Sequence, residues 1–160
     1  MPCIWLRHNN SQLFVTLAII PVSPGLLSQS AGVMLPEAPY LTTALVDTGA
    51  TITCLSGSCA NNAGLFPIGK IPIHGVGGLV NQNSYLFHVA FPIAMPPGLA
   101  LPGSAAPAMG QQQVQIHILD RIIQGCEFHA PSNFEVLLGM DVISTGTLVV
   151  QGDGGFSFSF

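Results

Sequence analysis

Short apolar stretches separated by turn residues recur along the whole chain. Residues 13–20 (Leu-Phe-Val-Thr-Leu-Ala-Ile-Ile) are apolar on both faces, which predicts a strand that is buried or paired at an interface. Residues 114–118 alternate apolar and polar side chains, as a half-buried strand does. Other stretches with β-branched and aromatic residues predict the remaining strands: 40–46, 51–55, 70–74, 79–91, 122–128, 134–138, 147–151 and 156–160.

Two places favour a short helix. Residues 56–64 offer Ser56 as an N-terminal cap and Gly64 just past the end, and a second helix should follow Gly139. Residues 21–39 are rich in proline and glycine and predict a loop region. Residues 96–113 are biased toward Pro, Ala, Gly and Gln, which predicts a surface insertion loop. We therefore expect an all-β fold with one or two short helices, in a single domain covering residues 1–160.

Residues 70–91 predict a long hairpin with an unusual tip. Gly75, Val76, Gly77 and Gly78 place three glycines in four residues between two β-like arms. Such a tip moves easily and lets backbone groups approach a ligand closely, although a plain hairpin turn has the same composition. At the other end of the chain, period-two alternation puts Phe156, Phe158 and Phe160 on one face of a strand, in the core or at a dimer interface.

The surface is nearly uncharged. Only 6% of the 160 residues are charged, against about 25% in an average domain, while 49% are hydrophobic. This composition leaves room for an apolar interface and suggests an oligomer. The net charge is −4 and the three basic residues, Arg7, Lys70 and Arg121, are scattered. These features exclude binding of nucleic acid through its phosphates and docking on a membrane through a basic patch.

The four cysteines (Cys3, Cys54, Cys59 and Cys126) form no CxxC pair, and the five histidines show no zinc-ligand spacing. We therefore predict no metal and no cofactor. Cys54 and Cys59 are close enough in sequence to pair, but nothing requires it, and free buried thiols in a reducing compartment are the simpler interpretation. With no recognisable signal peptide and no apolar run long enough to span a bilayer, the prediction is a cytoplasmic protein.

The stretch with the clearest chemistry is residues 44–55. The apolar run that ends at Val46 delivers Asp47 into a small turn, Thr48-Gly49-Ala50, and β-like residues follow. Asp and Gly are ordinary turn residues, so this motif alone fits a structural turn. The layout of strand, acid, tight turn and strand also presents a single carboxylate at the floor of a cleft.

Three features in order make the chain resemble the retropepsin-like aspartic proteases, which include the retroviral enzymes and the DNA-damage-inducible type. They are Asp47-Thr48-Gly49-Ala50 after an apolar strand, the glycine-tipped hairpin at Gly75–Gly78, and Leu137-Leu138-Gly139 before a short helix. The resemblance implies an acid-protease barrel with a flap hairpin. It further implies catalytic roles for Asp47, Thr48 and Gly49, with Thr48 bonding across a dimer axis.

The same resemblance implies that substrate contacts Ala50 and the flap-tip residues Gly75, Val76, Gly77 and Gly78. Residues 137–139 would pack beneath the Asp47 loop. The chain departs from the retroviral pattern at Met140, where those enzymes usually carry an arginine, and Asp141 follows. A salt-bridge network that braces the retroviral dimer is therefore absent or rebuilt.

The chemistry of this family needs two carboxylates that share a site, as the aspartic-protease dyad illustrates. The chain has one Asp-Thr-Gly, and Asp120, Asp141 and Asp153 lie in different settings. We therefore expect a homodimeric endopeptidase that acts on polypeptides, with one Asp47 from each chain. The alternatives are a catalytically silent domain that binds peptides or dimerises, and a structural β domain of an assembly protein.

Overall fold

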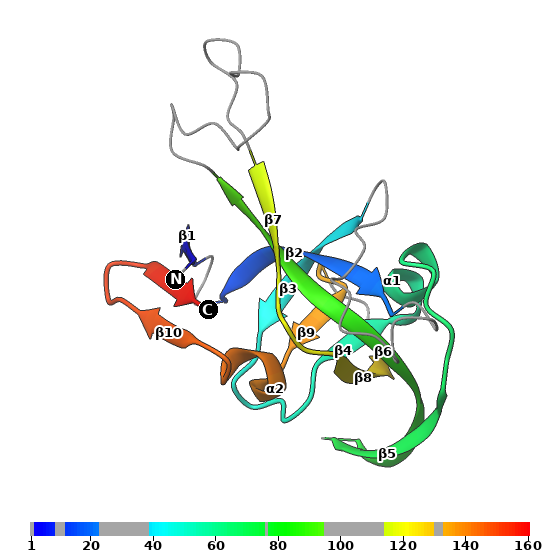
Figure 1. Ribbon diagram of the computed structural model, residues 1–160. Coiled ribbons are helices and arrows are strands. Elements are labelled where there is room, and N and C mark those ends of the chain that lie inside the picture. Colours follow the sequence, from blue (N-terminus) through cyan, green and yellow to red (C-terminus); the bar gives the residue numbers. More distant parts are fainter. Residues whose placement is uncertain (1, 9–11, 23–38, 76, 95–113, 130–132) are drawn as a thin grey trace, which may run out of the picture.

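The computed structural model describes residues 2–8, 12–22, 39–75, 77–94, 114–129 and 133–160. The predicted insertion at 96–113, most of the 21–39 region and Val76 lie outside the described residues. Within them the chain forms eleven strands and two short helices (Figure 1). In chain order these are β1 (Cys3–Arg7), β2 (Phe14–Pro21), β3 (Tyr40–Val46), β4 (Cys54–Ser56), α1 (Gly57–Asn62), β5 (Gly69–Gly75), β6 (Gly78–Ala94), β7 (Val114–Ile118), β8 (Ile123–Phe128), β9 (Val136–Leu138), α2 (Met140–Ile143), β10 (Thr147–Val150) and β11 (Gly155–Ser159).

The larger sheet closes on itself. Its strand order is β2-β3-β9-β4-β8-β6-β5, and β2 also pairs with β6, from Ala18 opposite Ala90 to Pro21 opposite Phe87. The closed ring leaves β5 and β7 as extensions from the long strand β6. Two pairs in the ring, β3 with β9 and β4 with β8, are parallel, and the other pairs are antiparallel. The expectation of an all-β barrel with two short helices is confirmed.

A separate three-stranded sheet, ordered β1-β11-β10, packs against the barrel. Phe91 of β6 joins the two layers, because its ring centroid lies 5.8 Å from that of Phe158 and 4.6 Å from that of Phe160. Phe156 and Phe158 are both buried. The alternation predicted for this terminal strand therefore places its aromatic side chains in the core.

The residues that predicted the first helix lie at its two ends as expected. Ser56 Oγ accepts a hydrogen bond of 3.0 Å from the Cys59 amide, which caps α1. Gly64 lies just beyond the helix with φ +69°, a conformation that residues with a side chain rarely adopt. Neither α1, with six residues, nor α2, with four, is long enough to cross a membrane, and the described residues contain no other helix.

The strand predicted for residues 51–55 is wrong in its first half. Strand β4 begins only at Cys54, and Thr51 and Ile52 form a bend. The reason is that the backbone there bonds to α2 instead of to a neighbouring strand: Met140 N–H donates to the Ala50 carbonyl at 2.8 Å and Asp141 N–H to the Thr51 carbonyl at 3.3 Å. These β-branched residues consequently support the Asp47 turn rather than extend the sheet.

Candidate active site around Asp47

Strand β3 ends at Val46, and Asp47 is the first residue of the turn that follows. Its amide donates to the Leu138 carbonyl at 3.0 Å, and its own carbonyl accepts from the Ala50 amide at 3.2 Å. One carboxylate oxygen, Oδ1, accepts from the Gly49 amide at 2.9 Å. The backbone thus holds the carboxylate in a fixed direction, which is how a single acid is positioned without a cation.

Asp47 as a residue is half-buried, and Thr48 and Gly49 beside it are exposed. Within the described residues Asp47 forms no ion pair, since the single contact there between a carboxylate and a basic side chain joins Glu127 to His129 at 3.2 Å. The Thr48 hydroxyl likewise bonds to nothing in the described part of this chain. The turn therefore presents an acid and a hydroxyl with unused hydrogen-bonding capacity.

The segment 137–139 lies between the two strands that flank this turn. Leu137 is opposite Leu45 of β3 and also opposite Cys54 of β4. Residue 139 must be glycine because the backbone of Ile52 passes close to it. A Cβ at this position would lie 2.5 Å from the Ile52 carbonyl carbon. The Asp47 turn consequently rests directly on the backbone that leads into α2.

Asp141 and Thr53 form a clamp that the sequence did not predict. Thr53 donates to the Asp141 carboxylate through its amide, at 3.0 Å, and through its hydroxyl, at 2.7 Å. The same hydroxyl accepts from the Gly139 amide at 3.1 Å. Thr53 is fully buried, so these bonds act in a low-dielectric setting. The clamp joins the exit of the Asp47 turn to the start of α2.

This clamp occupies the place where the sequence departs from the retroviral pattern. The Met140 side chain is partly exposed, whereas Asp141 is turned toward Thr53 within the same chain. Arg121 Nη1 donates to the Asp141 carbonyl oxygen at 2.9 Å. The signal available in the sequence was the position of Asp141 in the first turn of a helix, which explains its charge but does not identify Thr53 as its partner.

Gly75, Gly77 and Gly78 lie at the tip of the β5–β6 hairpin, where Gly75 pairs with Gly78. Gly78 has φ +101°, which favours glycine at that position. In Figure 1 the hairpin curves away from the barrel, and both its tip and the β3–β4 connection lie along the lower edge of the molecule. Asp47 to Ala50 thus form one turn and the tip glycines a second element, with no hydrogen bond between them among the described residues.

Leu79 and Val80, which follow the tip, are strongly exposed at 70% and 49%. An apolar, uncharged hairpin tip of this kind is suited to covering an apolar ligand or a partner surface.

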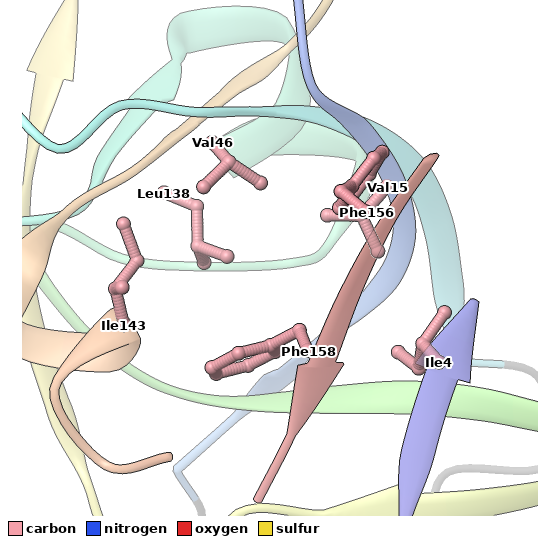
Figure 2. Close-up of a pocket in the computed structure, with 7 residues that line it drawn as sticks. All are labelled: Ile4, Val15, Val46, Leu138, Ile143, Phe156 and Phe158. Atoms are coloured by element: carbon pink, nitrogen blue, oxygen red, sulfur yellow. The ribbon is translucent and has the colours of Figure 1, made fainter. Parts of the chain in front are cut away.

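An apolar pocket lies behind the Asp47 strand (Figure 2). Val46, Leu138 and Ile143 line it from the barrel and α2, and Ile4, Phe156 and Phe158 face them from the terminal sheet. Val15 completes the lining, which contains no polar side chain. This pocket is a gap in the packing between two layers and offers no group for chemistry. The described residues also contain no cluster of three side chains able to hold a metal.

Glu135, just before β9, contrasts with Asp47. Its carboxylate accepts hydrogen bonds from Tyr40 and Thr42, both at 2.7 Å, and from Ser58 at 3.0 Å. Burial acts to raise the pKa of Glu135, but these three hydroxyl donors outweigh burial and lower the pKa below its ordinary value. Glu135 is therefore a saturated structural carboxylate that joins β3, β9 and α1.

Comparison with solved structures identifies the architecture. The crystal structure of a retropepsin-like aspartic protease from Rickettsia conorii is similar to this chain, with a TM-score of 0.51 and 12% sequence identity. The similarity covers 98% of this chain and 89% of that one. The fold is retropepsin-like. No family model and no curated protein sequence matches the chain.

Within this retropepsin-like fold, the sequence-predicted residues fall into two groups. Asp47, Thr48, Gly49 and Ala50 occupy the turn at the end of β3, and Gly75, Gly77 and Gly78 occupy the hairpin tip. Sequence reasoning missed Thr53 as the partner of Asp141. The Thr53 hydroxyl bonds both the Asp141 carboxylate and the Gly139 amide. Because Thr53 and Asp141 are 88 positions apart, no local sequence pattern predicts this contact.

Proposed function

We propose that this protein is a homodimeric aspartic endopeptidase in which two copies of Asp47 activate a water molecule. The observation that carries the proposal is the Asp47 carboxylate: it is fixed by the Gly49 amide, lacks a cation among the described residues, and lies at the end of a strand in a retropepsin-like fold. An acid held by one backbone amide keeps further acceptor capacity for a water molecule or a second carboxyl group.

The chemistry requires a second carboxylate, and no other acid in the described residues lies in the Asp47 turn. Asp141 is occupied by Thr53, and Glu135 by three hydroxyls. The second acid therefore comes from a second copy of the chain, on a two-fold axis beside the turn. The exposed Thr48 hydroxyl is placed to bond across that axis and lock the two turns together.

Two carboxylates in contact share one proton, because two like charges at short distance are not both stable. The ionised member removes a proton from the water, while the protonated member donates to the carbonyl oxygen of the peptide bond. As the amine leaves, the proton passes to its nitrogen. A polypeptide substrate binds in an extended form between the Asp47 turn and the glycine tip, and closure of the tip excludes water.

The experiment is peptide cleavage at mildly acidic pH by the wild type and by Asp47→Asn. A mixture of peptides of varied sequence serves as substrate, with product ends identified by mass spectrometry. We expect cleavage by the wild type and a loss of at least about a thousandfold in the variant. Asn keeps the acceptor oxygen for the Gly49 amide, so far-ultraviolet circular dichroism should match the wild type.

Equal cleavage by both proteins would remove Asp47 from the mechanism. No cleavage by either, together with peptide binding of equal strength, would support the alternative of a silent peptide-binding domain.

A further inference from the structure

Two of the four cysteines lie side by side in the core of the barrel. Cys54 on β4 is directly opposite Cys126 on the parallel strand β8, and their sulfur atoms are 3.0 Å apart. Both side chains are buried, with exposures of 9% and 1%. The other two thiols differ: Cys3 is exposed on β1, and Cys59 is buried in α1 without a sulfur neighbour in the described structure.

The backbone around this pair is already in place for a covalent bond. Neighbouring strands are spaced by about 4.8 Å, which lies inside the range of about 4.4–6.8 Å that a disulfide requires between Cα atoms. The Cys126 amide donates to the Thr53 carbonyl at 3.2 Å, which fixes the register beside the sulfurs. Gly125 allows this approach, because a Cβ there would lie 2.7 Å from the Thr53 oxygen.

The contact also prepares one sulfur for reaction. The hydrogen bond between the two thiols lowers the pKa of Cys126, although burial acts against it, and raises the pKa of Cys54. The thiolate is the reactive form of cysteine, which favours Cys126 as the sulfur that takes the first step. By contrast, burial raises the pKa of Cys59 to about 12, which keeps that thiol protonated.

We propose that Cys54 and Cys126 are a redox site that forms an intrachain disulfide when a small peroxide reaches it. The Cys126 thiolate attacks one peroxide oxygen, the O–O bond breaks, and water leaves after protonation, which gives a sulfenic acid. The Cys54 sulfur then attacks the Cys126 sulfur and expels the oxygen as a second water. Overall, two thiols and one hydrogen peroxide give one disulfide and two waters.

The disulfide would join residues 72 positions apart, and Cys54 directly follows the residue that clamps Asp141. Because the two strands are already paired in register, oxidation should strengthen the support beneath the Asp47 turn without displacing it. A crosslink that closes so long a loop strongly restricts the unfolded chain. The proposal depends on the two thiols alone and stands whether or not the protein cleaves peptides.

The test uses the full chain with Cys3→Ser, so that no exposed thiol can join two molecules. Three thiols remain, and after treatment with hydrogen peroxide and removal of excess we expect one to titrate under denaturing conditions. Peptide mapping without reduction should find Cys54 joined to Cys126. The thermal midpoint should rise by about 5 °C or more and return to its former value on reduction.

Two further variants locate the bond. Adding Cys59→Ala should leave oxidation unchanged, whereas adding Cys126→Ala should abolish the crosslink. Three titratable thiols after treatment, or a map that pairs Cys54 with Cys59, overturns the proposal. A crosslinked protein with an unchanged or lower midpoint overturns the inferred stabilisation. If a variant does not fold, the map of the Cys3→Ser protein decides the question by itself.

Discussion

Two carboxylates beside the paired strands β3 and β9 illustrate how environment assigns different roles to one functional group. Glu135 is saturated by three hydroxyl donors, whereas Asp47 receives one backbone amide in the described structure. The first joins elements together, and the second retains capacity for a water or a partner carboxylate. Residue type alone does not separate them, because the difference lies in the donors that the fold supplies.

Replacing Thr53 by valine tests the clamp by removing only the Thr53 hydroxyl oxygen and putting a methyl group in its place. The change keeps the shape but leaves the buried Gly139 amide without an acceptor and removes one donor to Asp141. We expect a loss of about 1–3 kcal/mol in the free energy of unfolding, measured by urea denaturation. Thr43→Val, at an exposed position on β3, should change stability by less than about 0.5 kcal/mol. Equal effects from both variants would show that the clamp contributes nothing.

Glu135→Gln tests the saturated carboxylate through pH. Because the folded-state pKa of Glu135 is lowered, its ionised form stabilises the native state above the unfolded pKa of about 4.3. That contribution disappears as pH falls through the lower, folded pKa. The variant should therefore be less stable than the wild type at pH 7, and the difference should shrink between about pH 5 and pH 3.

The measurement for Glu135→Gln is a series of urea titrations across this pH range. Asp120→Asn, at an exposed acid near Arg121, serves as the charge-matched control and should show little effect at any pH. A stability difference for Glu135→Gln that stays constant with pH would argue against the inferred pKa.

At the scale of elements, the Asp47 turn is bonded to the short strand β9 and to helix α2, which lie far from it in the sequence. Gly139 connects these two elements and lies against Ile52. Gly139→Ala should force the turn and α2 apart, with a loss of about 1–3 kcal/mol in stability and a larger fall in cleavage rate, since a small misplacement of a reacting group is costly. Gly69→Ala has open space around its Cβ and is the control.

Both glycine variants are compared by thermal denaturation and by the cleavage assay. Unchanged rates in Gly139→Ala would mean that the turn does not need this support.

The elements themselves were largely predictable from sequence. Residues 40–46 and 114–118 match β3 and β7 because periodicity and β-propensity agree there, and Ser56 and Gly64 mark the ends of α1 for local reasons. Thr51 and Ile52 misled the prediction, because tertiary bonds to α2 overrode their β-propensity.

Within the candidate site, the Asp47 turn could be located from the sequence because its acid and its glycine are close together in the chain. The Thr53–Asp141 clamp could not, since its residues are 88 positions apart.

For the whole molecule, the central question is whether one chain suffices. Among the described residues, β10 is an edge strand of the terminal sheet without charge, and Trp5 on the other edge strand, β1, is 65% exposed. An uncharged edge strand such as β10 is open to pairing with another chain. The closure of the barrel through β2 and β6 could not be predicted from sequence, because it depends on register between distant strands.

Mixing the wild type with Asp47→Asn tests the two-carboxylate requirement directly. If chains exchange freely and each active dimer needs both acids, equal amounts should reduce cleavage per wild-type chain to about half. A covalently linked dimer with one Asp47→Asn copy should be as inactive as one with two. Unchanged cleavage per wild-type chain after exchange, or activity in the singly substituted linked dimer, would place the whole reaction within one chain. Sedimentation at the assay concentration verifies that dimers are present.

The long sequence separation between Thr53 and Asp141 also determines when the Asp47 turn can form during synthesis. During synthesis the ribosome releases the Asp47 turn long before the segment that supports it, because the clamp partners are 88 positions apart. Until β9 and α2 emerge, the Ala50 and Thr51 carbonyls and the Thr53 hydroxyl have no partners there. A nascent polypeptide would therefore carry Asp47 in an unformed turn, so any function that needs the formed turn can begin only after β9 and α2 have been synthesised.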